Sequence, residues 1–169
     1  MEKNMEKRKS AEEIFMRANA KWEKRQNKVA LELFLQAAQL GNASAQHNVG
    51  YFYDEGIGTK KNYGRALSWY KRAWRNDHQT GTCINIAKLY ESNGQANLAV
   101  AWWKKAVARK DGDAALDLAK HYLQSGGTRE VRKAAALLKL VGTTRATEAA
   151  RREATKLLRS AVSARGLQS

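Results

Sequence analysis

Apolar residues recur along the chain at helical spacing, in a frame that appears three times. Each copy places apolar side chains at positions i, i+3, i+4 and i+7, which share one face of an α-helix. The copies lie at residues 30–37, 66–73 and 99–106, separated by 36 and 33 residues. A period of this length is typical of proteins built from stacked helix pairs. The pattern therefore predicts one amphipathic helix in each of three successive repeats.

A second helical pattern lies between these copies, at residues 45–53, 82–90 and 114–122. Each copy ends in a tyrosine and carries glycine or alanine three positions before it. A residue this small lets a neighbouring helix approach closely. Each repeat is therefore predicted to be a pair of helices.

A fourth, weaker copy of the first frame occupies residues 128–141, where Ala134, Leu138 and Val141 fall in register. Glycine is a common residue at helix ends and turns. Glycines stand at the predicted turns, at Gly56, Gly58, Gly94, Gly112, Gly126 and Gly127. We therefore expect four helix pairs, over residues 11–141.

The two ends of the chain carry different signals. Ser10 and Glu13 form a capping box, which predicts a helix over residues 11–26 and a flexible tail over residues 1–10. At the other end, residues 142–169 are predicted to form a basic segment with a final helix at about 144–164. Its apolar stripe consists of Ala150, Ala154, Leu157 and Leu158. Because an end repeat needs a polar cover, we interpret this helix as a C-terminal cap, with direct contact to a partner as the alternative.

One segment carries a more specific pattern. Residues 30–58 read A-x-x-L-F-x-x-A-A-x-x-G-x-x-x-A-x-x-x-V-G-x-x-Y-x-x-G-x-G. A dozen positions of this segment resemble the Sel-1-like repeat, a relative of the tetratricopeptide repeat. Residues 80–141 keep the alanine and aromatic positions but lose the paired glycines, so they resemble generic tetratricopeptide-type repeats. The resemblance covers residues 11–141.

The resemblance implies a right-handed all-α solenoid of four helix pairs with a capping helix. By the same resemblance, the helix type of residues 43–55 lines a concave face, and the type of residues 62–76 forms the outer surface. Small proteins of this kind resemble scaffold and effector-neutralising proteins, so the resemblance implies protein binding.

Composition agrees with helices in a reducing compartment. The chain has no proline, where average usage predicts about eight. Its single cysteine, Cys83, allows no internal disulfide, and no stretch approaches the length of a membrane-spanning helix. We therefore predict a monomeric cytoplasmic protein with no membrane association.

No group of residues predicts catalysis. His47, His78 and His121 occupy different repeat positions and lack the spacing of metal ligands. Asp111 and Asp113 match part of a calcium loop, but a helix cap explains them better because no glutamate follows at the required spacing. We predict no enzyme activity, no metal and no cofactor.

Cysteine and aromatic side chains are assigned to packing. Cys83 is expected to be half-buried and to pack rather than react. Trp69, Tyr70, Trp102 and Trp103 occupy the core positions of the repeat, so we expect core packing rather than a platform for stacking nucleic-acid bases.

The two kinds of helix differ in net charge. The chain has 31 Lys and Arg against 16 Asp and Glu, a net charge of +15. The helices predicted to be concave, at 43–55, 80–92 and 112–124, carry −3 together, whereas the outer helices at 62–76, 95–110 and 128–141 carry +11. A surplus this large attracts acidic proteins or nucleic acid.

The concave helices project a column of residues from each repeat. The predicted partner-binding residues are His47, Asn48, Tyr51, Ile84, Asn85, Lys88, Leu116, Asp117 and Lys120. Asn48 and Asn85 share a column, where an amide can donate to and accept from an extended peptide. Asparagine is also a common surface residue, so this column has an ordinary structural explanation too.

The outer helices carry rows of cations. The predicted basic outer surface consists of Lys71, Arg72, Lys104, Lys105, Lys139, Arg151 and Arg152. We predict a protein-interaction module, an adaptor, scaffold or immunity-type inhibitor, that binds an acidic protein and uses these cations to speed the encounter. The alternatives are a nucleic-acid-associated repeat protein, in which the cations bind phosphates, and a merely solvated basic face.

Overall fold

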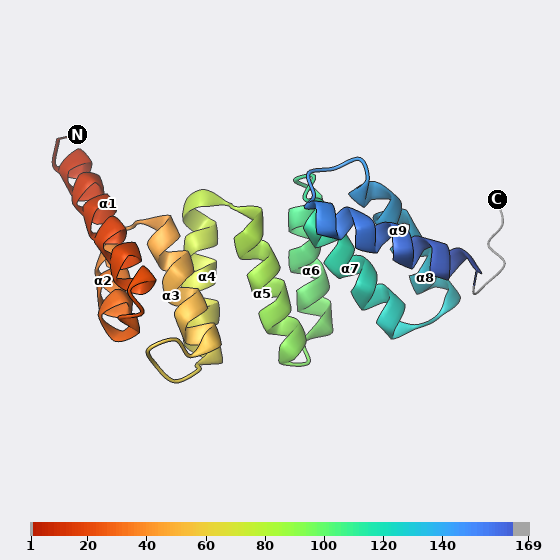
Figure 1. Cartoon of the computed structure of the whole chain (residues 1–169), viewed down its shortest axis with the longest axis horizontal. Coiled ribbons are helices and arrows are strands. Elements are labelled where there is room, and N and C mark those ends of the chain that lie inside the picture. Colours follow the sequence, from red (N-terminus) through yellow and green to blue (C-terminus); the bar gives the residue numbers. More distant parts are fainter. Residues whose placement is uncertain (1, 164–169) are drawn as a thin grey trace. The chain divides into compact units, whose positions relative to one another are not determined.

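The computed structural model describes residues 2–163, which form nine helices and no strand (Figure 1). The predicted fold class, an all-α solenoid of helix pairs, is confirmed. The chain divides into two compact units, Met1–Leu89 and Tyr90–Ser169. Each unit is described by itself below.

The first unit contains two complete helix pairs. Helix α1 (Glu2–Glu23) packs against α2 (Asn27–Gln39), and α3 (Ala43–Glu55) packs against α4 (Tyr63–Asp77). Helix α5 (Thr80–Ser92) begins in this unit and ends in the second. Asn42 and Asn62 cap α3 and α4, because their side chains accept hydrogen bonds from the first turns.

Helix α1 begins at Glu2, well before the capping box. The predictions of a helix start at Ser10 and of a tail before it are therefore wrong for residues 2–9. These residues are mostly Glu, Lys and Arg, which are strong helix formers, so the helix continues through Ser10 toward the N-terminus.

Aromatic rings fill the core between the first helices. The Phe34 and Phe52 rings lie 5.4 Å apart, and Trp22 lies 5.3 Å from Phe52. Gly50 of α3 faces the ring of Tyr70, and a Cβ atom at Gly50 would lie 2.6 Å from that ring. The predicted close approach at this small residue is confirmed, because any side chain there would collide with Tyr70.

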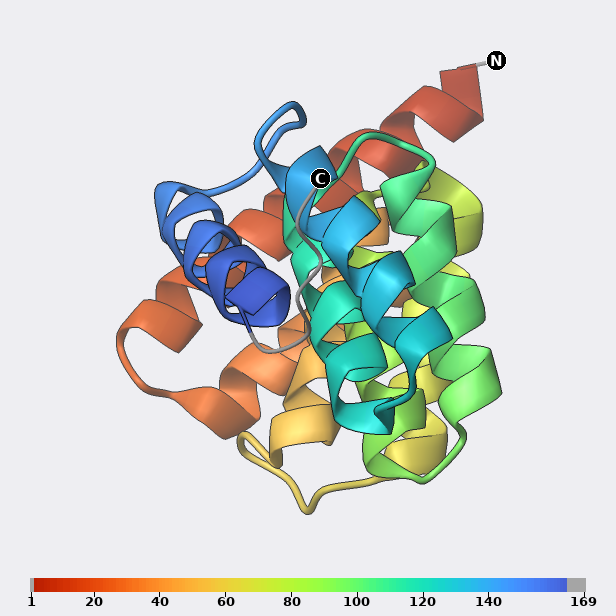
Figure 2. The same cartoon turned by 90° about the vertical axis from the view of Figure 1, so that its right-hand side faces the viewer.

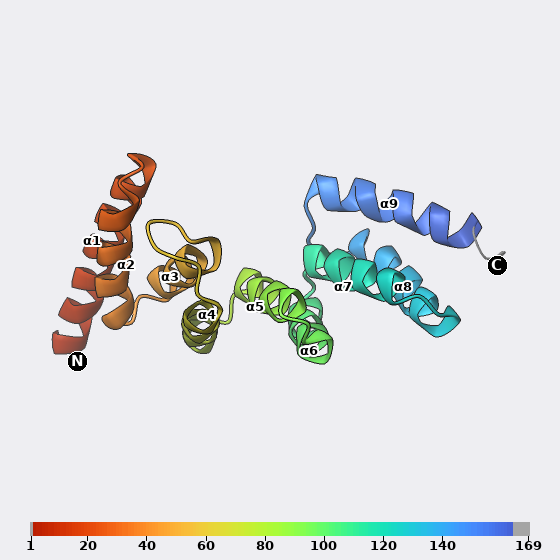
Figure 3. The same ribbon diagram turned by 90° about the horizontal axis from the view of Figure 1, so that it is seen from below.

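The second unit holds α6 (Ala96–Val107), α7 (Gly112–Ser125), α8 (Thr128–Val141) and α9 (Glu148–Ser163). Figure 2 shows α7 and α8 side by side, and Figure 3 shows α9 along one side of this pair. The three helices share one core, made of Ala115, Leu116, Ala119, Ala134, Leu138, Val141, Ala150 and Ala154. The fourth copy of the apolar frame is therefore confirmed, and α9 covers the last helix pair.

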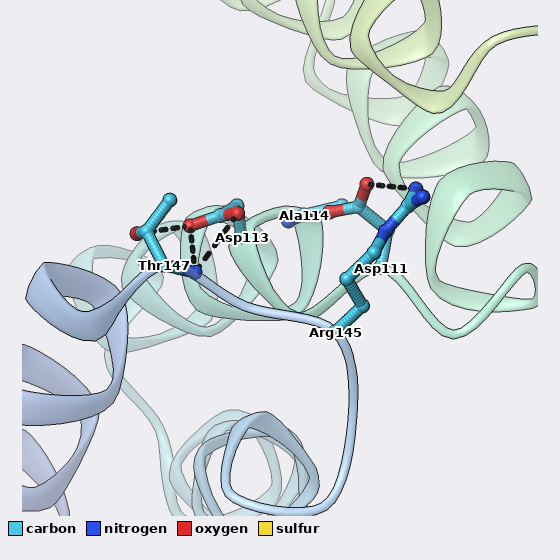
Figure 4. A network of polar contacts seen from close by, with 5 residues as sticks. All are labelled: Asp111, Asp113, Ala114, Arg145 and Thr147. Carbon is cyan, nitrogen blue, oxygen red and sulfur yellow. Dashed lines mark hydrogen bonds and ion pairs between the residues drawn. The ribbon is translucent and has the colours of Figure 1, made fainter.

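The segment before α9 is hydrogen-bonded to the start of α7 (Figure 4). Gly112 donates its backbone N–H to the Arg145 carbonyl oxygen at 2.7 Å, and Asp113 accepts a hydrogen bond from the Thr147 hydroxyl at 2.7 Å. A Cβ atom at Gly112 would lie 2.6 Å from the Thr144 hydroxyl oxygen, so only glycine allows this approach. Helix α9 starts at Glu148, later than predicted, because residues 144–147 serve as this connection.

Asp111, which matched part of a calcium loop in the sequence, serves as a helix cap in the structure. Asp111 caps α7 by accepting a hydrogen bond from the Ala114 N–H at 3.0 Å, and its other carboxylate oxygen lies 3.7 Å from the Arg145 guanidinium (Figure 4). The predicted helix cap is confirmed. The end of the predicted last helix, at residue 164, lies outside the described residues.

Candidate functional site

The first unit places the predicted concave residues of α3 and α5 near one another. Lys88 is exposed, and the five others are half-buried: His47, Asn48, Tyr51, Ile84 and Asn85. Helix α3 turns Asn48 and Tyr51 to the same side because they are one turn apart. On α5, Asn85 and Lys88 have the same relation. We call Asn48, Tyr51, Asn85 and Lys88 the inner stripe.

A polar network joins α3, α4 and α5 beneath this stripe. His47 shares a hydrogen bond with the Thr82 hydroxyl at 3.0 Å through Nδ1, and its Nε2 lies 3.4 Å from the Asn85 amide nitrogen. Asn85 also hydrogen-bonds Tyr70, whose hydroxyl donates to Asp54 at 3.3 Å. The predicted pair of equivalent asparagines is therefore unequal, because Asn85 belongs to this network and Asn48 makes no such bond to the residues that the structure describes.

Burial sets the protonation of this network. It lowers the pKa of His47, and the charge of Asp77 offsets this only in part. It also raises the pKa of Tyr70, with the Asp54 carboxylate adding to the effect. A neutral His47 fits the geometry, since Nε2 accepts from the Asn85 amide and Nδ1–H is left to donate to Thr82.

Helix α1 contributes a hollow that the sequence did not indicate. It has a volume of about 490 Å³ and is lined by Met16, Asn19, Trp22 and Glu23. Tyr51 of the inner stripe neighbours one of its lining residues, with its ring centroid 6.1 Å from that of Trp22. The available signal was Met16, an apolar residue just outside the helix stripe formed by Phe15, Ala18 and Trp22.

In the second unit, α9 packs against the corresponding face of α7. Leu116 is only 5% exposed because α9 packs over it, so the prediction that Leu116 projects toward a partner is wrong. The Lys120 ammonium lies 2.6 Å from the Glu153 carboxylate of α9. Asp117 is half-buried. On α7, Leu116 is therefore closed to a partner, and Lys120 is engaged by α9.

On α4 and on α6, a cationic side chain lies over a tryptophan ring of the same helix. Arg72 lies over the Trp69 ring at 5.2 Å, and Lys105 lies over Trp102 at 3.8 Å. Trp69 and Trp102 are half-buried rather than core residues, which corrects the prediction for both. Tyr70 and Trp103, one position later, are fully buried as predicted.

The remaining predicted basic residues differ in their surroundings. Lys104 and Lys139 are exposed and Lys71 is half-buried. Arg151 donates to the Thr144 carbonyl oxygen at 3.2 Å, and Arg152 pairs with Glu148 one turn earlier on α9. The cations of α9 thus serve in part to stabilise the cap.

Reactive groups are not gathered in the part of the chain that the structure describes. Cys83 is completely buried, deeper than predicted. Among residues 2–163, no three His, Cys, Asp or Glu side chains lie close enough to hold a metal ion. None of the described helices has both the length and the apolar character needed to span a membrane.

The stacked helix pairs and their repeated core frame define a helical-repeat protein. The family model for the Sel1 repeat matches residues 21–42, 43–78, 92–111 and 112–140, which is more than half of the chain. The chain belongs to the Sel1 repeat family. Repeats of this family are generally protein–protein interaction modules rather than enzymes.

Sequence relatives are much longer proteins. Protein sel-1 homolog 2 of Homo sapiens and of Mus musculus is 38% identical over 63 residues, which covers 37% of this chain and 9% of that protein. The chitin synthase regulator SKT5 of Malassezia restricta is 38% identical over 55 residues, 32% of this chain and 4% of the regulator. This chain thus spans less than a tenth of the length of these relatives.

Solved structures share the fold. A Sel1 repeat protein from Oxalobacter formigenes superposes with a TM-score of 0.64 at 22% identity, over 76% of this chain and 54% of that one. MamA protein gives a TM-score of 0.67 at 16% identity, over 96% of this chain and 84% of that one. A protective antigen of uropathogenic Escherichia coli gives 0.57 at 27% identity, over 66% and 25% of the two chains.

Proposed function

We propose that this chain is a monomeric, cytoplasmic, non-catalytic adaptor or inhibitor that binds an acidic partner protein through the inner stripe. The observation that carries this proposal is the difference between the two units. Asn48, Tyr51 and Lys88 remain accessible on α3 and α5, whereas on α7 the Leu116 side chain is buried in the core shared with α9 and the Lys120 ammonium is paired with Glu153 of α9. The partner surface in this proposal extends to Ile84 at its edge, within the first unit.

In this proposal the basic outer surface speeds the association of the chain with its acidic partner. Exposed charges of one sign speed the association of oppositely charged proteins and contribute less to the lifetime of the complex. Lys104 and Lys139 are exposed on α6 and α8 and fit this role. Arg72 and Lys105 are stacked on tryptophan rings, so their charge is held at fixed positions on the surface.

The test starts from the partner that copurifies with the protein at low salt and is identified by mass spectrometry after nuclease treatment. The double variant Asn48→Ala/Lys88→Ala should raise the dissociation rate of this partner, because it removes two side chains that contact the partner in this proposal. Reversal of Lys71, Lys104 and Lys139 to Glu should instead slow association and change its salt dependence. A double variant that binds like the wild type contradicts the proposal.

Nucleic acid is the second candidate ligand, because the outer helices carry a large positive charge. The tryptophan faces stacked under Arg72 and Lys105 are occupied, which argues against base stacking there. In this case the lysine reversals would lower affinity steeply and reduce the salt dependence, while the Asn48/Lys88 variant would bind normally. A 260 nm absorbance excess that nuclease removes would favour this candidate.

A further inference from the structure

A polar cleft lies between the first half of α1, the turn from α2 to α3 and the last turn of α4, all within the first unit. Its volume is about 520 Å³, and it shares no residue with the hollow at Met16. Its charged and amide lining residues are Lys7, Arg8, Glu12, Asn42 and Asn76. Three helices and a turn thus bring polar side chains together at a place that neither the core frame nor the inner stripe explains.

Hydrogen bonds hold the amide wall of this cleft in place. The Asn42 side chain accepts from the Ala45 N–H at 2.7 Å and donates to the Glu12 carboxylate at 2.8 Å. The Asn76 amide donates to the Gln46 side-chain oxygen at 2.7 Å, and Gln46 is almost completely buried. Since an amide NH₂ has two hydrogens, Asn76 keeps one hydrogen and its oxygen for a peptide backbone in the cleft.

The charges that line the cleft indicate the sign of its ligand. Lys7 and Arg8 are exposed, and among the side chains that the structure describes neither forms an ion pair. Glu12 stands one turn after Arg8 on α1, but its carboxylate bonds Asn42 instead. The lining therefore has two cations and one anion. The positive end of the α3 backbone dipole, at Ala43, also faces the cleft and adds to this surplus.

The size of the surplus distinguishes a carboxylate from a phosphate. One carboxylate brings a single negative charge, which the net charge of +1 on the lining side chains balances. A phosphate monoester brings almost two charges at neutral pH and would meet the Glu12 carboxylate in the same cleft. The amide of Asn76 likewise suits a polypeptide, whose backbone presents both donors and acceptors.

We propose that the polar cleft binds an aspartate or glutamate side chain of an acidic segment of the partner protein. Lys7 and Arg8 bind the carboxylate, and Asn76 hydrogen-bonds the backbone beside it. This inference rests on the proposed function and deepens it, because it gives the acidic partner a defined contact on the first unit in addition to the inner stripe.

Two asparagine amides of the cleft can report on this contact. Full-length protein labelled with ¹⁵N is titrated with two end-blocked peptides of glycine and serine, which have Asp-Asp or Asn-Asn at the centre. The side-chain amide resonances of Asn42 and Asn76 should shift saturably with the aspartate peptide, while that of Asn19, on α1 outside the cleft, moves little. The asparagine peptide should bind about tenfold more weakly, because hydrogen bonds between ionised groups are much stronger than neutral ones.

A matched pair of double variants tests the two cations. Lys7→Gln/Arg8→Gln should remove most of the preference for aspartate, and glutamine preserves the helical propensity of α1. Lys9→Gln/Arg17→Gln is the control, because it removes one lysine and one arginine that are exposed on the same helix outside the cleft. It should keep the preference and weaken the aspartate peptide by less than about twofold, through long-range charge alone. Circular dichroism checks that both variants retain α1.

Each contrary result overturns the carboxylate site. Equal binding of the two peptides, equal losses in the two double variants, or no shift of the Asn42 and Asn76 amides would show that the cleft accepts no carboxylate. Tighter binding of a phosphoserine peptide than of the aspartate peptide would assign the cleft to phosphate. If the copurified partner is lost with Asn48→Ala/Lys88→Ala but retained with Lys7→Gln/Arg8→Gln, the proposed function stands and the carboxylate site alone fails.

Discussion

Tyr70 and Trp103 occupy the same position of the repeat, 33 residues apart, and both are fully buried. Their polar atoms have different surroundings. The Tyr70 hydroxyl donates to Asp54 and is linked through Asn85 to His47. The indole N–H of Trp103 has no hydrogen-bond partner among residues 2–163, although the His121 ring lies 5.4 Å away.

The difference shows how one repeat frame supports two kinds of junction. In the first unit, a polar network ties α3, α4 and α5 together and leaves the inner stripe open. In the second unit, α7, α8 and α9 are held together by an apolar core, and α9 packs over Leu116 of α7. The frame specifies that a large aromatic ring is buried, whereas its polar partners come from residues outside the frame.

The largest expected effect is a loss of stability on removal of the buried Trp103 side chain. Trp103→Ala should lower the free energy of unfolding by about 3–5 kcal/mol, because a large aromatic side chain at 1% exposure leaves a cavity. Chemical denaturation measures the change. A variant of wild-type stability that no longer bound the partner would place Trp103 at the binding surface and contradict the repeat frame.

A smaller effect separates the two aromatic positions. Tyr70→Phe should cost about 1–2 kcal/mol, since Asp54 and Asn85 lose their common partner at a partly buried site. Trp103→Phe is the matched variant, because it removes an N–H that has no acceptor and costs only packing. If Tyr70→Phe were neutral in urea denaturation, the network would not stabilise the first unit.

A pH effect should come from the first unit. Because burial lowers the pKa of His47 in the folded state, the unfolded chain binds a proton more readily below its ordinary pKa of 6.5. The contribution of His47 to stability is complete above that value and falls as the pH decreases toward the folded pKa. Thermal unfolding between pH 7 and pH 5 should therefore show a larger loss for the wild type than for His47→Gln. Equal losses would refute this assignment.

The smallest effect concerns the cap of the second unit. Lys120 and Glu153 are both partly exposed, so their ion pair is screened by water. Lys120→Ala should change the free energy of unfolding by less than about 1 kcal/mol. A much larger loss would mean that the ion pair, rather than the alanine stripe of α9, holds the cap in place.

The spacing of apolar residues predicted the core well because one face of a helix follows from its period. Phe34, Tyr70 and Trp103 are buried as the frame requires, and Ala134 and Leu138 extend it to the fourth pair. The same reasoning placed Leu116 on an open face, because a periodic pattern within α7 contains no information about a helix that arrives from elsewhere in the sequence.

The candidate site was predicted less completely for the same reason. The partners of His47 are Thr82 and Asn85, which belong to another helix, so spacing along α3 does not reveal them. Trp22, which lines the hollow, likewise lies 6.1 Å from the Tyr51 ring of α3, a neighbour that spacing along α1 does not reveal. Resemblance to a repeat family led to the prediction of which helices face a partner, and the structure then distinguished accessible side chains from buried ones.

Photo-cross-linking tests the central claim most directly. A photoreactive phenylalanine analogue is placed at one position at a time, at Asn48 of the inner stripe, at Leu116 under α9 and at Arg132, which is exposed on α8. After irradiation with the copurified partner, position 48 should give a cross-linked protein complex, whereas positions 116 and 132 should give none. Cross-links from position 132 to a protein or nucleic acid, with none from position 48, would contradict the account.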